Sequence, residues 1–328
     1  MSAPYRIAIL GGGAWGTALA AALRRTGAEV ALWLRDPAQA ESIRQGANPR
    51  YLPGISLPEG IAATTDLPQA LSGADCVLVA VPAQTLRAVL ADAAPLLPPE
   101  APLVLCAKGI ERDTGLLLSA VAQQAAPGHL IAALSGPSFA TDVARGLPTA
   151  VVIAAAETGL AAELSHRFST GDFRCYSSND LIGVEIGGAL KNVFAIAAGA
   201  VTGAGLGASA QAAMVTRGFV ELRRIAESFG ADPETLMGLS GLGDLILTCS
   251  TVQSRNFSYG AALGRGDSLH GLPLAEGVAT SGIAAAIAAQ RGVEAPIISA
   301  VAAILDRAMT VREAVVALMN RPLKSETE

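Results

Sequence analysis

The feature that most constrains this chain is a glycine-rich segment near its start, directly after a short apolar run. Residues 11–16 read GGGAWG, which fits the pattern G-x-G-x-x-G; Ile7–Leu10 precede them and a segment of helical length follows. In that setting Gly11 permits a tight turn, Gly13 lets a pyrophosphate approach the backbone, and Gly16 lets the helix pack closely on the strand. The free N–H groups at the helix start would face the phosphates. The segment therefore predicts a dinucleotide-binding strand–turn–helix unit, with an ordinary glycine turn as the alternative.

More apolar runs follow in the first half of the chain and alternate with segments of helical length. They are Val30–Leu34, Cys76–Val81, Leu103–Ala107, Leu130–Leu134 and Ala150–Ala155. Continuous runs of this kind are typical of strands buried on both faces of a parallel sheet. After Tyr176 they give way to Ala-rich segments with helical periodicity: Leu181–Ala200, Ala208–Phe229, Gly277–Arg291 and Ser299–Met319. We predict an α/β chain, with a doubly wound sheet of Rossmann type in residues 1–178 and an all-helical domain in residues 179–328.

Composition excludes several classes of function. The net charge of −5 gives no sign of nucleic-acid binding. The four cysteines are widely spaced, which indicates free thiols in a reducing compartment, and the three histidines lack the spacing of a metal site. We find no signal peptide. The uncharged stretch Val193–Thr216 is long enough to span a bilayer, but its glycines favour a helix packed inside a protein.

The end of the second predicted strand should meet the ribose of a bound dinucleotide. An acidic side chain about 20 residues after the glycine motif favours NAD, whereas an arginine accepts the additional phosphate of NADP. This sequence offers both, as Arg35 and Asp36. Asp36 precedes Pro37 and could equally start the next helix. We favour Arg35 at the adenosine end, so that NADP is usable, and leave NAD open.

Two lysines have informative positions, because only three of the 23 basic residues are lysines. Lys108 follows an apolar run, and the carboxyl ends of such strands face the ligand crevice of an open α/β sheet. Lys191 shares a helix face with Gly187, Gly188 and Ala195, which would leave room for a ligand beside it. The alternative for the glycines is a close helix crossing. Burial would lower the pKa of Lys191 and suit it to general acid–base catalysis.

Three polar segments are candidates for ligand binding. Residues 135–140 (SGPSFA) follow a strand, so Ser138 and free N–H groups could bind an anion or an amide, or only form an N-cap turn. Asp244 could contact a ligand or cap a helix. The guanidinium of Arg255, flanked by Ser254 and Asn256, resembles a phosphate grip. Alternatively, Ser254 caps a helix and Arg255 is solvated.

Taken in order, six segments resemble the NAD(P)-dependent glycerol-3-phosphate dehydrogenases of bacterial type. They are GGGAWGTALA, LCAKGIE, LSGPSFA, EIGGALKNVFAIAAG, GLGDLILTC and QSRN, and the resemblance extends from Ile7 to beyond Arg312. It implies a Rossmann domain and a helical domain with the active site between them. It further implies reversible reduction of dihydroxyacetone phosphate to sn-glycerol 3-phosphate for phospholipid synthesis, NADP or NAD as cofactor, and a cytoplasmic homodimer.

The resemblance also implies roles for individual residues, with Lys191 as proton donor and acceptor. Substrate contacts would be Lys108, Gly136, Ser138, Lys191, Asp244, Ser254, Arg255 and Asn256. Beside the motif glycines Gly11, Gly13 and Gly16, cofactor contacts would be Trp15, Arg35, Lys108, Ala140, Arg255, Leu274 and Glu276. The sequence departs from the family pattern at two positions. Gly12 replaces a usual alanine and would loosen the turn, and Ala279 replaces an arginine at the periphery of the cofactor site.

Two other functions fit parts of the sequence. A dehydrogenase of the 3-hydroxyacid type would use the same lysine with a carboxylate substrate, although the Ser254–Asn256 cluster argues for a phosphate. A non-catalytic NAD(P)-binding regulator would need the glycine motif but not Lys191. An assay of NAD(P)H absorbance with dihydroxyacetone phosphate distinguishes both functions from that of a glycerol-3-phosphate dehydrogenase.

Overall fold

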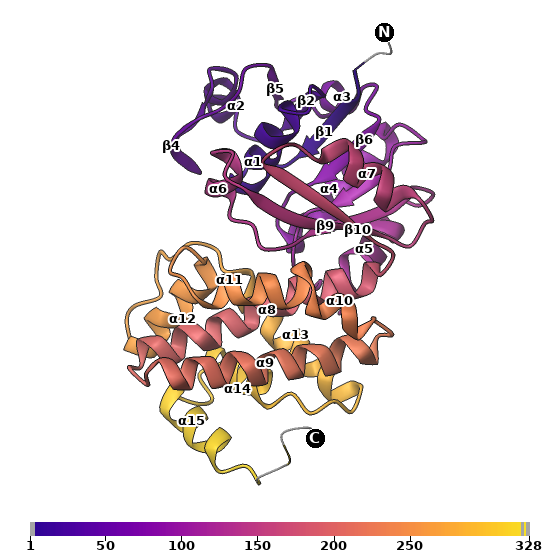
Figure 1. Ribbon diagram of the computed structural model, residues 1–328. Coiled ribbons are helices and arrows are strands. Elements are labelled where there is room, and N and C mark those ends of the chain that lie inside the picture. The colour runs from indigo at the N-terminus through magenta and orange to yellow at the C-terminus, as the bar shows by residue number, and fades with distance from the viewer. Residues whose placement is uncertain (1–3, 323–324, 326–328) are drawn as a thin grey trace. The chain divides into compact units, whose positions relative to one another are not determined.

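The computed structural model describes residues 4–322 and 325, and its chain divides into two compact units, each described here by itself (Figure 1). Unit 1 comprises the chain up to Gly188 together with Gly230–Asp244, and unit 2 comprises Ala189–Phe229 and the chain from Leu245 onward. The domain boundary predicted at residues 178/179 differs from this observed division in two ways. The division falls later, inside a long helix, and the chain returns to unit 1 at 230–244 because the π-helical turn η3 (Leu239–Gly243) packs against strand β9.

Within the described residues, unit 1 contains an eight-stranded sheet with the order β10-β9-β8-β7-β6-β1-β2-β5. The strands are β1 Arg6–Leu10, β2 Glu29–Trp33, β5 Ile61–Thr64, β6 Cys76–Val79, β7 Leu103–Leu105, β8 Ile131–Ser135, β9 Thr149–Ala155 and β10 Phe173–Ser178. From β5 to β8 all neighbours pair in parallel, and the chain steps outward from the central β1 in both directions. This is the doubly wound order of dinucleotide-binding sheets, so the predicted fold class is confirmed.

Both faces of this sheet are buried, which explains its continuous apolar runs. In β1, Ile7 and Ile9 face one hydrophobic layer, and Ala8 and Leu10 face the other. The first layer is covered by α1 Ala14–Arg24, α2 Pro37–Arg44, α6 Ala140–Ala144 and α7 Leu160–Phe168, and the second by α3 Leu67–Leu71, α4 Leu86–Ala93 and α5 Leu118–Ala125. Figure 1 shows α7 beside β9 and β10, against which it packs. Two short 3₁₀ turns, η1 Ala83–Thr85 and η2 Ala94–Leu96, flank α4.

The expectation of a wholly parallel sheet is wrong at one end. β9 pairs antiparallel with β8, and the next strand, β10, is parallel to β9. The connection from β8 to β9 contains only the five-residue helix α6, which packs on α1. Parallel neighbours are usually joined through a full crossover helix, and α6 is only a short one. The hairpin of β3 (Ala47–Asn48) and β4 (Leu52–Ser56) was also not predicted.

All described elements after β10 are helical, as predicted. They are α8 Leu181–Gly203, α9 Ala208–Ser228, α10 Pro233–Met237, η3, α11 Asp244–Cys249, α12 Arg255–Arg265, α13 Glu276–Gln290, α14 Pro296–Leu305 and α15 Val311–Met319. The prediction of one helix over Ser299–Met319 is wrong, because α14 and α15 are separate. Arg307 adopts a φ of 59° between them, and Thr310 starts α15 through a capping box with Glu313.

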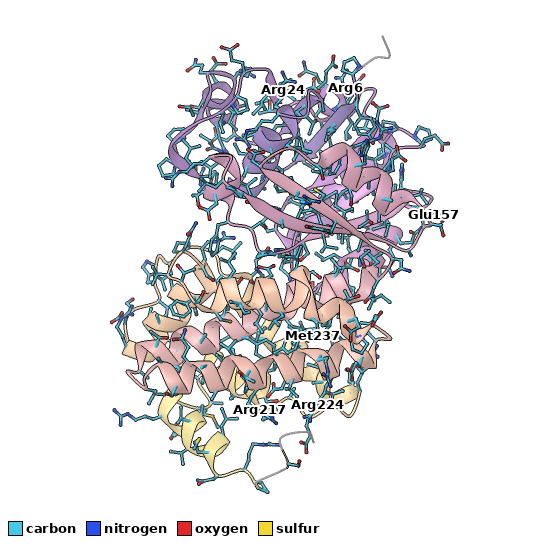
Figure 2. All side chains as sticks on the ribbon, viewed as in Figure 1. Arg6, Arg24, Glu157, Arg217, Arg224 and Met237 are labelled. Atoms are coloured by element: carbon cyan, nitrogen blue, oxygen red, sulfur yellow. The ribbon has the colours of Figure 1, made fainter. Side chains whose placement is uncertain are left out.

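The apolar stretch that raised the possibility of a membrane span is divided between two helices, α8 and α9. Of the described helices, α8 is the one long and apolar enough to cross a bilayer, but 83% of its most apolar window is buried. A Cβ on Gly199 would lie 2.0 Å from the Phe257 carbonyl oxygen, so its glycines serve a close contact with α12. α9 carries the charged Arg217 and Arg224 (Figure 2). These observations indicate that α8 is a core helix.

Candidate active site

The glycine loop at the start of α1 has the backbone that its sequence predicts. Gly11 has a φ of +118°, and a Cβ there would lie 2.8 Å from the Ala80 carbonyl oxygen. A Cβ on Gly16 would lie 1.8 Å from the Gly11 carbonyl oxygen, which explains why the first turn of α1 needs glycine. At Gly13, the N-cap of α1, a Cβ would meet nothing within 4 Å. No acidic residue lies in the first turn of α1, so its N–H groups and this open space can receive an anion.

Gly12 does not leave the loop loose, contrary to expectation. A Cβ at this position would lie 2.8 Å from the Leu34 Cβ, so the side chain of Leu34 occupies the space that alanine would need. The carbonyl oxygen of Gly12 is also held by side chains, which are described below. The loop is therefore restrained from both sides.

At the end of β2, Asp36 and Arg35 have different surroundings. The Asp36 carboxylate caps α2, accepting hydrogen bonds from the N–H groups of Ala38 (3.0 Å) and Gln39 (3.3 Å). Its other oxygen lies 3.7 Å from the Arg50 guanidinium. Arg35 is exposed and has no hydrogen bond or ion pair with another described residue. The alternative in which Asp36 starts the next helix is thus confirmed.

Four of the predicted substrate residues meet within unit 1. Lys108, after β7, donates from Nζ to the Asp244 carboxylate at 2.6 Å and to the Gly136 carbonyl oxygen at 3.1 Å. The Ser138 hydroxyl donates to the same carbonyl at 3.0 Å. The Asp244 side chain is 1% exposed and that of Lys108 is 14% exposed. The result is a buried ion pair beside a turn, with the lysine amine at its more accessible end.

The expectation of a cleared helix face beside Lys191 is wrong. A Cβ on Gly188 would lie 2.8 Å from the Ser135 hydroxyl and 3.4 Å from the Lys108 Cγ. A Cβ on Gly187 would lie 2.8 Å from the Ser240 carbonyl oxygen. Protein atoms fill the space, so the close-packing alternative holds. The two glycines let the backbone of α8 lie directly against Lys108.

Lys191 itself is buried on α8 and 7% exposed. Its Nζ donates a hydrogen bond to the Thr248 hydroxyl at 2.8 Å. Thr248 lies on α11, four residues after Asp244 and therefore on the same helix face. One short helix thus carries a partner of each lysine. Thr248 was not among the predicted site residues, although its i, i+4 spacing from Asp244 in GLGDLILTC could have indicated it.

The Ser254–Asn256 segment makes the contacts expected of the alternative in which Ser254 caps a helix and Arg255 is solvated. Ser254 is the N-cap of α12 and accepts from the Phe257 N–H at 3.3 Å, while Arg255 is exposed, without a partner among the described residues. Asn256 is buried, donating to the Asn192 side chain at 2.9 Å and accepting from the Gly277 N–H at 2.9 Å. Its amide therefore ties α12 to α8 and α13. A phosphate-binding role for this segment stays a prediction.

The remaining predicted cofactor residues occupy helix starts or the surface. Ala140 is the first residue of α6, and Glu276 is the first residue of α13. Leu274 is 58% exposed. Within unit 1, the Trp15 indole N–H is buried and has no hydrogen-bond partner among the described residues. Among residues 4–322 and 325, no group of three or more His, Cys, Asp and Glu side chains could hold a metal ion.

One half-buried carboxylate on α8 was not predicted. Glu185 of α8 accepts hydrogen bonds from the Ser119 N–H at 2.8 Å and from the Ser119 hydroxyl. Burial raises the pKa of Glu185 to about 7, although these hydrogen bonds act in the opposite direction. The contact fastens the start of α8 to the first turn of α5.

Comparison with known proteins gives matches along nearly the whole chain. The family described as NAD-dependent glycerol-3-phosphate dehydrogenase N-terminus matches residues 6–161, and the corresponding C-terminus family matches residues 180–316. A glycerol-3-phosphate dehydrogenase (NAD(P)+) of Mesorhizobium japonicum is 70% identical over 98% of this chain and 94% of its own length. A glycerol-3-phosphate dehydrogenase (NAD(P)+) from Chelativorans sp. is 61% identical over 99% of this chain and 100% of its own length. The crystal structure of glycerol-3-phosphate dehydrogenase from Coxiella burnetii superposes with a TM-score of 0.92, at 38% identity over 97% of this chain and 99% of that chain.

Proposed function

The chain belongs to the NAD-dependent glycerol-3-phosphate dehydrogenase family, and from that premise we propose which of its residues carry the reaction. It is an NAD(P)-dependent oxidoreductase that interconverts glycerol 3-phosphate and dihydroxyacetone phosphate. The match to dehydrogenases of this activity over 98–99% of the chain carries this conclusion. It disfavours both a 3-hydroxyacid-type dehydrogenase and a non-catalytic regulator.

The glycine loop fits a dinucleotide. Gly13 has open space where a Cβ would stand, and the N–H groups of the first turn of α1 have no acidic competitor. The buried Trp15 indole N–H has no partner among the described residues and can donate to a ligand. We assign Gly11, Gly13, Trp15 and Gly16 to this cradle. When bound there, NAD(P)H supplies the hydride.

Lys191 is proposed as the proton donor. When C2 of dihydroxyacetone phosphate gains a hydride, its carbonyl oxygen becomes negative and takes one proton to form the hydroxyl. A buried ammonium can stabilise that charge and deliver the proton, and its hydrogen bond to Thr248 orients it. A positioned acid contributes about 10²–10⁴-fold in rate. In the reverse reaction, the neutral amine accepts the proton.

Lys108 is proposed to hold the substrate by charge. The Asp244 carboxylate orients the Lys108 amine at 2.6 Å, beside the turn that carries Gly136 and Ser138. We assign these four residues to substrate binding. Arg255, with Ser254 and Asn256, is proposed to bind the substrate phosphate, because an exposed guanidinium without a partner among the described residues can form a bidentate contact. Such remote binding energy would position the reacting carbon.

The surroundings of Arg35 favour use of NADP. Asp36 uses one oxygen for capping, and Arg50 offsets its charge at 3.7 Å. Exposed Arg35 can then accept a 2′-phosphate without competition from a free carboxylate. We further propose Ala140, Leu274 and Glu276 as cofactor contacts. We also propose that the protein is a homodimer that serves phospholipid synthesis. We place it in the cytoplasm, a reducing compartment that agrees with the free cysteines Cys76, Cys106, Cys175 and Cys249.

The test of the proposed chemistry is the substitution Lys191→Ala. We expect kcat for dihydroxyacetone phosphate reduction to fall at least about 100-fold, with the NAD(P)H dissociation constant within about threefold of that of the unaltered protein. Lys191→Arg keeps the charge but has no readily released proton, so it should recover binding of the substrate without recovering turnover. Near-normal turnover in either variant would remove Lys191 from the mechanism.

A further inference from the structure

The carbonyl oxygen of Gly12, inside the glycine loop, accepts hydrogen bonds from three described side chains. The donors are the Thr17 hydroxyl at 3.3 Å, the Asn48 amide nitrogen at 3.2 Å and the Gln39 amide nitrogen. They come from α1, β3 and α2, respectively. A backbone carbonyl has two lone pairs and commonly serves one helix or sheet bond. Convergence of side chains from three elements therefore holds this one peptide group in place.

Asn48 has no surface role. It is fully buried, and its amide nitrogen also donates to the Thr17 hydroxyl at 2.9 Å. Only the nitrogen can donate to the Gly12 carbonyl, which fixes the orientation of the amide. Its oxygen, also buried, has no hydrogen-bond partner among residues 4–322 and 325. A buried acceptor without a partner opposes folding, so core packing alone does not account for asparagine here.

Holding the Gly12 carbonyl has a direct consequence for Gly13. In a trans peptide the C=O of one residue and the N–H of the next lie in one plane and point in opposite directions. No cis peptide occurs in the described chain. When Asn48, Gln39 and Thr17 draw the Gly12 carbonyl inward, the Gly13 N–H is directed away from them. A Cβ on Gly13 would have no atom within 4 Å, so the space beside this residue is open.

We propose that Asn48 and Gln39 are positioning residues for the dinucleotide. By holding the Gly12 carbonyl, they keep the Gly13 N–H pointed at the pyrophosphate of NAD(P)H before it binds. The loop is then already ordered in the free protein, so cofactor binding does not carry the entropic cost of ordering it. This inference rests on the proposed function, since it takes NAD(P)H as the ligand.

Intrinsic fluorescence provides the test, because the chain's two tryptophans, Trp15 in α1 and Trp33 at the end of β2, both lie beside the glycine loop. Quenching by NADH and by NADPH is titrated for Asn48→Ala, Gln39→Ala and the double variant. We expect each single variant to bind both cofactors about tenfold more weakly, with kcat at saturating cofactor within about twofold. Because both side chains act on one oxygen, their effects in the double variant should not be additive.

Gln45→Ala is the matched control. Gln45 caps the end of the same helix as Gln39, but its exposed side chain donates a hydrogen bond to Glu41 at 2.7 Å and has no hydrogen bond to the glycine loop. It should bind NAD(P)H as the unaltered protein does. If Asn48→Ala does not fold, Gln39→Ala carries the test, because Gln39 lies half-buried at the surface of α2.

Two failures are distinguishable. If neither NADH nor NADPH quenches the tryptophan fluorescence of the unaltered protein, the proposed function fails. If it binds NADH or NADPH while both variants bind equally well, even with lowered melting temperatures, then these residues serve stability alone and the positioning proposal is overturned.

Discussion

Substituting Gly13 by alanine separates what the free protein needs from what the cofactor needs. Gly13 has a φ of −68° and a ψ of −177°, an extended conformation that any residue adopts. A Cβ would meet no atom within 4 Å. Alanine reduces the entropy of the unfolded chain, which stabilises a compatible site by about 0.4–1 kcal/mol, but it is a poorer N-cap than glycine. These effects oppose each other, so the free energy of unfolding should change by less than about 1 kcal/mol.

Cofactor binding should respond differently. The added methyl group occupies the open space through which the pyrophosphate is expected to reach the backbone. We expect the NAD(P)H dissociation constant of Gly13→Ala to rise at least tenfold, which corresponds to about 1.4 kcal/mol. Gly12→Ala is the contrasting variant, because its Cβ would lie 2.8 Å from the Leu34 Cβ in the free protein. Overpacking of this kind costs about 1–3 kcal/mol of stability whether or not cofactor is present.

The two quantities are measured by urea unfolding without ligand and by fluorescence titration with NADH and NADPH. We expect opposite patterns for the two variants. Gly13→Ala should lose affinity for NAD(P)H with its free energy of unfolding nearly unchanged, whereas Gly12→Ala should mainly lose stability. If Gly13→Ala binds both cofactors with unchanged affinity, the pyrophosphate does not approach the backbone at Gly13, and the assignment of this loop is refuted.

Three further predictions concern single side chains. Arg35→Ala should lower kcat/KM for NADPH at least about tenfold and that for NADH by less than about threefold, and equal losses would contradict a contact with the 2′-phosphate. Asp244→Ala leaves the Lys108 ammonium without its carboxylate, so urea unfolding should show a loss of about 3 kcal/mol, and an unchanged midpoint would argue against the pair. Burial raises the pKa of Glu221 to about 7. The folded protein therefore retains a proton that the unfolded chain releases between about pH 4.5 and 7, and stability falls as pH rises through that window, by up to about 1.4 kcal/mol per pH unit. Urea unfolding at pH 5, 6 and 8 should show a steeper fall for the unaltered protein than for Glu221→Gln, in which Glu185 still contributes a slope of the same sign; parallel curves would contradict the contribution of Glu221.

Local sequence rules were sufficient for much of the fold. The alternation of Ile7 and Ile9 with Ala8 and Leu10 between two hydrophobic layers is a property of any strand buried on both faces. The glycine loop is similar, because the tight turn at Gly11 and the close approach at Gly16 are steric demands that few other residues meet. The capping of α2 by Asp36 likewise involves residues two and three positions away. Each depends on neighbours along the chain and could be predicted from them.

Contacts between distant segments decided the rest. The sequence identified Gly187 and Gly188 as a special pair, but whether a ligand or protein lies beside them depended on Ser135, Lys108 and Ser240. The antiparallel pairing of β9 with β8 is likewise a contact between separate segments, and the apolar run of β9 does not show its direction.

The clearest case is the carbonyl oxygen of Gly12. Its sequence neighbours indicate a phosphate loop, yet the side chains that hold it include Asn48, 36 residues away. Sequence patterns register which residues a strand or turn requires, because those requirements are steric and local. A hydrogen bond between a backbone atom and a distant side chain produces no periodic pattern in the amino-acid sequence, because only folding brings the two groups together.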